Sequence, residues 1–91
     1  MAYSAPVRPD LDQLVRRLRH LPPGAWPERR DAVRSLLVAL AGPRPVPDLP
    51  DHALADAVAV IGSDAIVAAA GDPDAEAAVT AALQAALTAT R

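Results

Sequence analysis

The residues that could act as general acids or bases are the two histidines, His20 and His52. Acid–base or nucleophilic catalysis needs a nucleophile, a base and an orienting group close together. Neither histidine has a serine or an aspartate at the spacing of a catalytic motif. His20 follows an apolar helical pattern, and an imidazolium stabilises the dipole at a helix C-terminus. We therefore expect structural roles for both histidines, no catalytic residues and no enzyme activity.

Three acidic residues, Asp72, Asp74 and Glu76, alternate as at the start of a calcium-binding loop. An EF-hand loop also needs a glycine at its sixth position and a distant glutamate. Here Glu76 is followed by Ala77 and Ala78, which favour a helix. The chain has no cysteine, which excludes disulfides and thiolate metal sites. We predict no metal and no cofactor, and we expect Asp72 to cap a helix.

A short stretch, Gly62-Ser63-Asp64-Ala65-Ile66, resembles the attachment signature of acyl carrier proteins. In that family a serine hydroxyl carries phosphopantetheine, and here Ala65 stands in its place without a hydroxyl. Helix capping explains the stretch instead: Gly62 would end one helix, and Ser63 would cap the next. On this interpretation, Ser63→Ala would cost about 0.5–2 kcal/mol of stability.

All nine basic residues are arginines, and their distribution is uneven. Residues 1–45 hold eight arginines and four acids (+4), whereas residues 46–91 hold one arginine and seven acids (−6), which sums to −2. This polarity favours head-to-tail pairing of two copies or docking of the two halves within one chain. No aromatic residue lies among the arginines for base stacking. The arginines therefore form either a solvated polar face or a surface for an anionic protein or RNA, with nucleic acid the less favoured partner. The predicted anionic-partner patch consists of Arg16, Arg17, Arg19, Arg29, Arg30 and Arg34.

Apolar periodicity predicts an all-α fold, because no stretch alternates polar and apolar residues as a half-buried strand would. We expect a compact bundle of four to five short helices, with an N-terminal helical hairpin followed by alanine-rich C-terminal helices. Asp10 is the predicted N-cap of the first helix, and the third helix begins at Asp48 or Asp51. The predicted helices cover residues 10–20, 27–41, 51–61, 64–70 and 73–90.

A chain of 91 residues forms one domain at most. We predict a disordered lead-in over residues 1–9 and a single helical domain over residues 10–91. A proline-rich connector, residues 42–50, lies inside this domain and should be stiff and extended. Trp26 precedes Pro27, so its backbone should also be extended, with its ring at one end of the core.

The most informative segment is the last helix, because residues 77–90 contain no charged side chain. Val79, Leu83 and Leu87 mark its core side. A surface helix normally has a charged outer face, so this helix should be buried on more than one side. Either the other helices surround it, or its second side is an interface in a homo-oligomer or with a partner. The predicted interface residues are Ala77, Ala81, Gln84, Ala85 and Thr88.

These observations favour a non-catalytic protein–protein interaction or adaptor module, self-associating through the charge-free last helix. The alternative is a nucleic-acid-associated regulator that uses the arginine patch. The expected partner is another protein or a second copy, with no membrane association. No secretory signal is present, and the apolar run over residues 36–41 is far too short for a membrane span, so we expect a cytoplasmic protein. The abundance of Ala, Arg, Pro and Asp suggests a GC-rich bacterial genome.

Overall fold

The computed structural model describes residues 7–91, so residues 1–6 of the predicted lead-in lie outside the described part. The described chain is helical, without a strand, which confirms the all-α bundle with four helices rather than five. A short 3-10 helix (Pro23–Ala25) precedes the second helix. The four helices are α1 (Val7–Arg19), α2 (Trp26–Ala41), α3 (Asp51–Ala69) and α4 (Pro73–Ala89).

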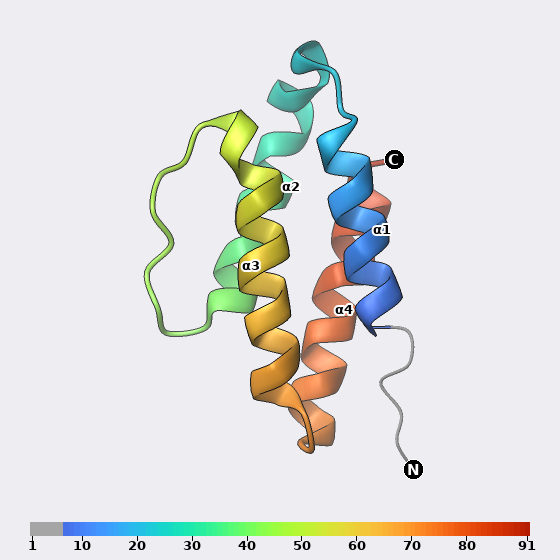
Figure 1. Ribbon diagram of the computed structural model, residues 1–91, viewed down its shortest axis with the longest axis vertical. Coiled ribbons are helices and arrows are strands. Elements are labelled where there is room, and N and C mark those ends of the chain that lie inside the picture. Colours follow the sequence, from blue (N-terminus) through green and yellow to red (C-terminus); the bar gives the residue numbers. More distant parts are fainter. Residues whose placement is uncertain (1–6) are drawn as a thin grey trace.

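The helices α3 and α4 contact each other, and α1 and α2 flank them. Each of the outer helices packs against both α3 and α4, whereas α1 and α2 make no contact with each other. The predicted N-terminal hairpin is therefore wrong as a packing unit, although the chain does reverse between α1 and α2 (Figure 1).

The proline-rich connector, residues 42–50, sets the direction of α3. It leaves the end of α2 and returns along the side of the molecule to the level where α2 began (Figure 1). As a result α2 and α3 run parallel, while α1 and α4 run together in the opposite direction (Figure 1). A connector that crosses the length of a bundle is the usual way to join two parallel neighbours.

One cluster of buried side chains draws on all four helices. The radius of gyration is 12.5 Å, close to the value of about 12 Å expected for a compact chain of this length. Leucine and valine fill this core because the chain contains no phenylalanine. The apolar side chains with the least exposure are Leu11, Leu14, Leu18, Val33, Leu37, Leu54, Val58 and Leu83, and the polar Thr90 is buried as fully as these.

Helix α1 starts three residues earlier than predicted, so Asp10 is not its N-cap and residues 7–9 are not part of a lead-in. Val7 is 3% exposed, and its burial extends the apolar stripe of Leu11 and Leu14 back by one turn. Pro9 does not oppose this start, because the first turn of a helix needs no backbone donor there. Asp10 instead lies in the first turn, and its Oδ2 atom has no hydrogen-bond partner within residues 7–91.

The predicted break at Gly62 and Ser63 is also wrong, because α3 passes through both residues as one helix. Gly62 is buried, and a Cβ atom there would lie 2.6 Å from Leu11 Cδ1. This glycine therefore allows α1 to approach α3 closely and does not end a helix. Ser63 caps nothing, and its Oγ atom accepts a hydrogen bond from Arg8.

Trp26 differs from the prediction in backbone but not in burial. It adopts helical angles (φ −62°, ψ −40°) as the first residue of α2, and it is 6% exposed. The preference of a pre-proline residue for extended backbone is modest. We attribute the outcome to burial of the indole ring and to the hydrogen bond from the Trp26 amide to the Pro23 carbonyl.

The other predicted helix ends are confirmed. Gly42 and Gly71 have positive φ angles of 64° and 88°, where other residues would be strained. The Asp72 carboxylate accepts hydrogen bonds from the amides of Asp74 (3.1 Å) and Ala75 (3.3 Å). These bonds satisfy backbone donors that the first turn of α4 leaves open, so Asp72 is the cap that the sequence predicts.

Helix α3 is long and apolar enough to cross a membrane on length and composition alone, with a mean hydropathy of 1.5. The core helix of a bundle passes the same test. In this fold α3 packs against the three other helices, and Leu54 and Val58 on it are almost fully buried. Packing in the bundle therefore accounts for part of its apolar composition, since 33% of this apolar segment is buried.

Candidate functional site

Over residues 77–90, the side of α4 that faces away from the core is exposed and carries no charge, and the exposed Asp74 lies in the first turn before this stretch. Leu83 is fully buried on the core side, with Val79 and Leu87 half-buried beside it. The other helices therefore do not surround α4, and that interpretation of its missing charges is wrong. All five predicted interface residues are exposed on this side: Ala77, Ala81, Gln84, Ala85 and Thr88.

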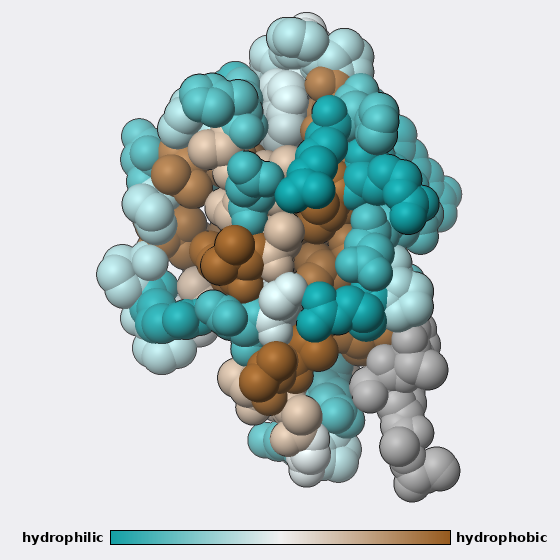
Figure 2. Space-filling model, in the orientation of Figure 1, coloured by the Kyte–Doolittle hydropathy of each residue, from teal (hydrophilic) through white to brown (hydrophobic). Residues whose placement is uncertain are grey.

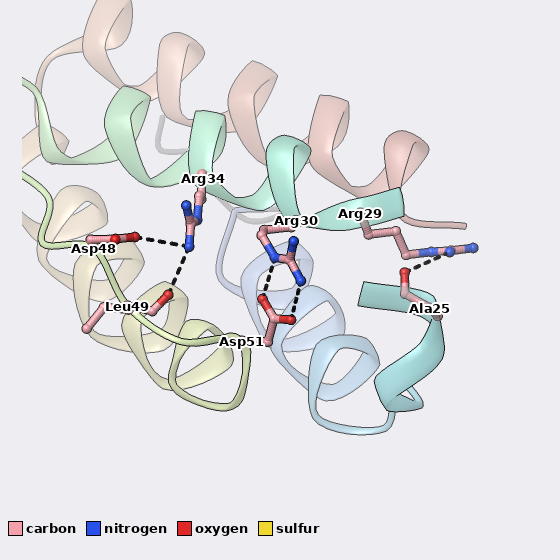
Figure 3. Close-up of polar contacts among 7 residues, drawn as sticks. All are labelled: Ala25, Arg29, Arg30, Arg34, Asp48, Leu49 and Asp51. Carbon is pink, nitrogen blue, oxygen red and sulfur yellow. Dashed lines mark hydrogen bonds and ion pairs between the residues drawn. The ribbon is translucent and has the colours of Figure 1, made fainter. Parts of the chain in front are cut away.

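The predicted arginine patch does not form one surface, because most of its members bind other parts of the chain. Arg30 donates two hydrogen bonds of 2.7 Å to the two carboxylate oxygens of Asp51 (Figure 3). Arg34 reaches the Leu49 carbonyl oxygen at 3.0 Å and the Asp48 carboxylate at 3.1 Å (Figure 3). These two arginines of α2 hold the end of the connector and the first turn of α3.

The arginines at positions 17 and 29 bind the C-terminal end of α4. Arg17 donates to the Leu87 carbonyl oxygen at 2.7 Å. Arg29 donates to the main-chain oxygens of Thr90 and Arg91 at 3.4 and 2.9 Å and to that of Ala25 at 3.3 Å (Figure 3). The last carbonyls of a helix have no partners within it, and cations near them are stabilising. Both arginines are therefore part of the scaffold.

Two members of the patch remain on the outer side of α1. Arg19 forms an exposed ion pair of 3.0 Å with Asp56 of α3. Arg16 is exposed, and its side chain has no hydrogen-bond or ion-pair partner within the described residues. The structure adds Arg8, which the predicted lead-in had excluded and which donates to Ser63 Oγ at 2.9 Å. The spacing of Val7 to Leu11 and Leu14 is the signal that could have placed Arg8 on this helix.

The Arg30–Asp51 pair has the clearest electrostatic effect in the described chain. The hydrogen bonds from Arg30 lower the pKa of the Asp51 carboxyl, although partial burial opposes the shift. The same hydrogen bonds raise the pKa of Arg30. Both side chains are about one-third exposed, at 36% and 30%. The pair therefore stabilises the ionised form of each partner and fastens α2 to α3.

The two histidines occupy different hollows beside Arg19. His20 and Ser63 line one hollow of about 400 Å³ between α1 and α3, and His52 and Trp26 line another of about 430 Å³. His20 Nδ1 lies 2.8 Å from the Arg16 carbonyl oxygen. Neither histidine hydrogen-bonds to an acidic or hydroxyl side chain within residues 7–91. In the same range, no three side chains of His, Asp or Glu cluster as metal ligands would.

Three large apolar side chains are exposed: Val38 of α2 and Val60 and Val67 of α3, at 60%, 62% and 71%. Figure 2 shows apolar side chains reaching the surface along α3, between hydrophilic groups. Single exposed apolar residues are ordinary on protein surfaces. Asp56 and Asp64 are exposed on the same helix, so these valines do not form a charge-free face like that of α4.

No protein-family model, no curated protein and no solved structure matches the chain.

Proposed function

We propose that this protein is a non-catalytic interaction module that associates with other proteins through the exposed, charge-free face of α4. The proposal rests on one observation: the predicted interface residues lie on the side that the bundle leaves uncovered. The face is defined here as Ala77, Ala81, Gln84, Ala85 and Thr88.

Physical chemistry favours association through such a face. Burying alanine requires almost no loss of side-chain entropy, whereas ordering a lysine or arginine costs up to about 2 kcal/mol. No charge must be removed from water when a partner helix covers residues 77–90. Small side chains also permit close approach of helix axes. Gln84 and Thr88 can supply hydrogen bonds that fix the register of the partner.

A second copy of the chain is the first partner to test. We expect light scattering over a wide range of concentration to show a dimer or larger species. Ala81→Glu should raise the dissociation constant about tenfold or more, equal to about 1.4 kcal/mol, because a carboxylate would be buried without a partner. Since Ala81 is exposed in the folded chain, the circular dichroism spectrum should stay unchanged, and so should the melting temperature at a concentration where both chains are monomeric.

The matched control is Ala39→Glu, which adds the same charge at an exposed alanine of α2. It should leave association unchanged. An equal loss with both variants would mean that net charge, and not the α4 face, governs association. If the wild-type chain is monomeric at every concentration, the partner is a different protein, and Ala81→Glu must then lose a partner that the wild type captures from its host.

The alternative function, a nucleic-acid-associated regulator, has weaker support. Of the six arginines on which it rests, five already have partners within the chain. Nucleic-acid binding that neutralises several phosphates weakens steeply with salt. If the affinity for the partner does not change with salt concentration, the nucleic-acid alternative is excluded. If the affinity falls steeply with salt, association of that partner through the uncharged α4 face is excluded.

A further inference from the structure

The seam between α1 and α3 is hollowed on both sides of one side chain, Arg19. The first hollow has a volume of about 400 Å³, and the second about 430 Å³. Both volumes fall within the range of ligand sites. Arg19 lines both hollows, so they adjoin on either side of its ion pair with Asp56, and together they are called the groove here. Figure 2 shows apolar side chains along this seam, with hydrophilic ones beside them.

The first hollow is basic. Arg8, Arg16 and Arg19 line it with His20, and Asp12 is the one acidic side chain among the lining residues. Arg8 binds only the neutral Ser63 hydroxyl in the described chain, so its charge is not compensated there. Arg16 has no side-chain partner within residues 7–91. This half of the groove therefore attracts carboxylates.

His20 adds a further polar group to this hollow. A carbonyl oxygen can only accept a hydrogen bond, so the contact with Arg16 assigns the proton to Nδ1 of the ring. The Nε2 atom is then left for a ligand, as an acceptor in the neutral ring and as a donor in the imidazolium.

The second hollow combines apolar and charged lining residues. Its lining includes Leu18, Leu21, Pro23, Trp26 and Ala55. Asp51 and Asp56 also line it, but Arg30 and Arg19 already bind these two carboxylates. A large apolar side chain of a ligand would lose contact with water here and gain contact with Leu21 and Pro23, the apolar lining residues that are not buried.

We propose that this groove binds an acidic peptide segment that carries one large apolar side chain. The carboxylates lie in the basic hollow, and the apolar side chain lies in the hollow beside Trp26. Single-stranded nucleic acid fits less well, because Trp26 is 6% exposed and cannot offer its ring for base stacking. The proposal is independent of association through α4.

The test uses Trp26, the only tryptophan of the chain, as a fluorescent probe. A short synthetic peptide with one leucine and three glutamates is titrated into the full chain. We expect a saturable change in Trp26 emission. Replacing the leucine with glycine should abolish the emission change, and replacing the glutamates with lysines should abolish binding.

Two arginine variants locate the site. Arg16→Gln should weaken peptide binding about tenfold, the effect of about 1.4 kcal/mol. Arg44→Gln removes the same charge from an exposed position in the connector and should change affinity less than twofold. Arg8→Gln repeats the test at the other end of the basic hollow and should also weaken binding.

Three results would overturn the proposal: no saturable signal at millimolar peptide, equal weakening by Arg16→Gln and Arg44→Gln, or equal affinity for the lysine peptide. Ala81→Glu separates the two proposed surfaces. It should disrupt association through α4 and leave peptide binding as in the wild type, so failure of one proposal does not imply failure of the other.

Discussion

Helix α3 packs against two basic helices, and the two seams are built differently. Along α2, Arg30 and Arg34 find acceptors in Asp51, Asp48 and the Leu49 carbonyl oxygen, and these contacts close the seam. Along α1, Arg19 pairs with an exposed carboxylate, and Arg16 has no partner in the described chain. Arginine thus fastens the seam between α2 and α3, whereas the seam between α1 and α3 stays hollow and basic.

The two seams differ in the hydrogen-bond acceptors that they offer to the arginines. The connector brings Asp48 and the free carbonyl of Leu49 to the α2 seam just before α3 begins. The α1 seam contains only helix side chains, since the backbone carbonyls inside a helix are already hydrogen-bonded. A count of arginines therefore says little about which of them can bind a partner.

The largest effect on stability should come from adding a side chain at Gly62, where α1 and α3 approach each other closely. Gly62→Val places side-chain atoms where even a Cβ would lie 2.6 Å from Leu11 Cδ1, and Leu11 is 1% exposed with little room to move. We expect a loss of about 1–3 kcal/mol in the free energy of unfolding, measured by urea denaturation. Gly24→Val, where no atom lies within 4 Å of the added Cβ, should change stability by no more than about 0.5 kcal/mol. Equal stability of both variants would show that the close approach does not determine how α1 packs.

A smaller, pH-dependent effect should come from the α2 seam. Because Arg30 lowers the pKa of Asp51, the pair stabilises the fold above the ordinary aspartate pKa, and this contribution is lost as pH falls through the lowered value. Asp51→Asn should therefore lower the melting temperature at about pH 7 and have progressively less effect below about pH 4. Asp64→Asn is the control, an exposed aspartate of the same helix. A pH-independent effect of Asp51→Asn would contradict the role of the ion pair.

The smallest effect on stability should come from the exposed pair of the α1 seam. Arg19 and Asp56 are 55% and 74% exposed, and such pairs contribute about 0–1 kcal/mol. Arg19→Gln should therefore change the free energy of unfolding by less than about 1 kcal/mol, and less still in about 1 M salt. The same variant should weaken binding of the acidic peptide, since Arg19 lines both hollows. A large loss of stability with unchanged peptide binding would mean that both seams use arginine for the same purpose.

The sequence predicts the helices well where the signal is local. Gly42, Gly71 and Asp72 end or cap helices through their own backbone and side-chain chemistry. It fails where a distant residue decides the outcome. Gly62 looks like a helix stop until Leu11, far away in the chain, is found against it.

The same limit applies to the candidate sites. The uncharged side of α4 follows from periodicity alone, because its core stripe and its opposite side belong to one helix. Periodicity does not predict which residues the arginines bind. Their acceptors lie on other elements, as Leu87 does for Arg17 at a sequence separation of 70 residues.

The absence of contact between α1 and α2 has a consequence for how the chain could be divided. Apart from the contact of α2 with the short 3-10 helix that precedes it, the helix–helix contacts of α1 and α2 all cross the connector, so the first half has no core of its own. The two halves carry opposite formal charges, +4 and −6. Cleavage within residues 42–50 would therefore give a basic fragment that cannot fold alone and an acidic one that completes it. We therefore expect the two pieces to regain the bundle only when they are mixed.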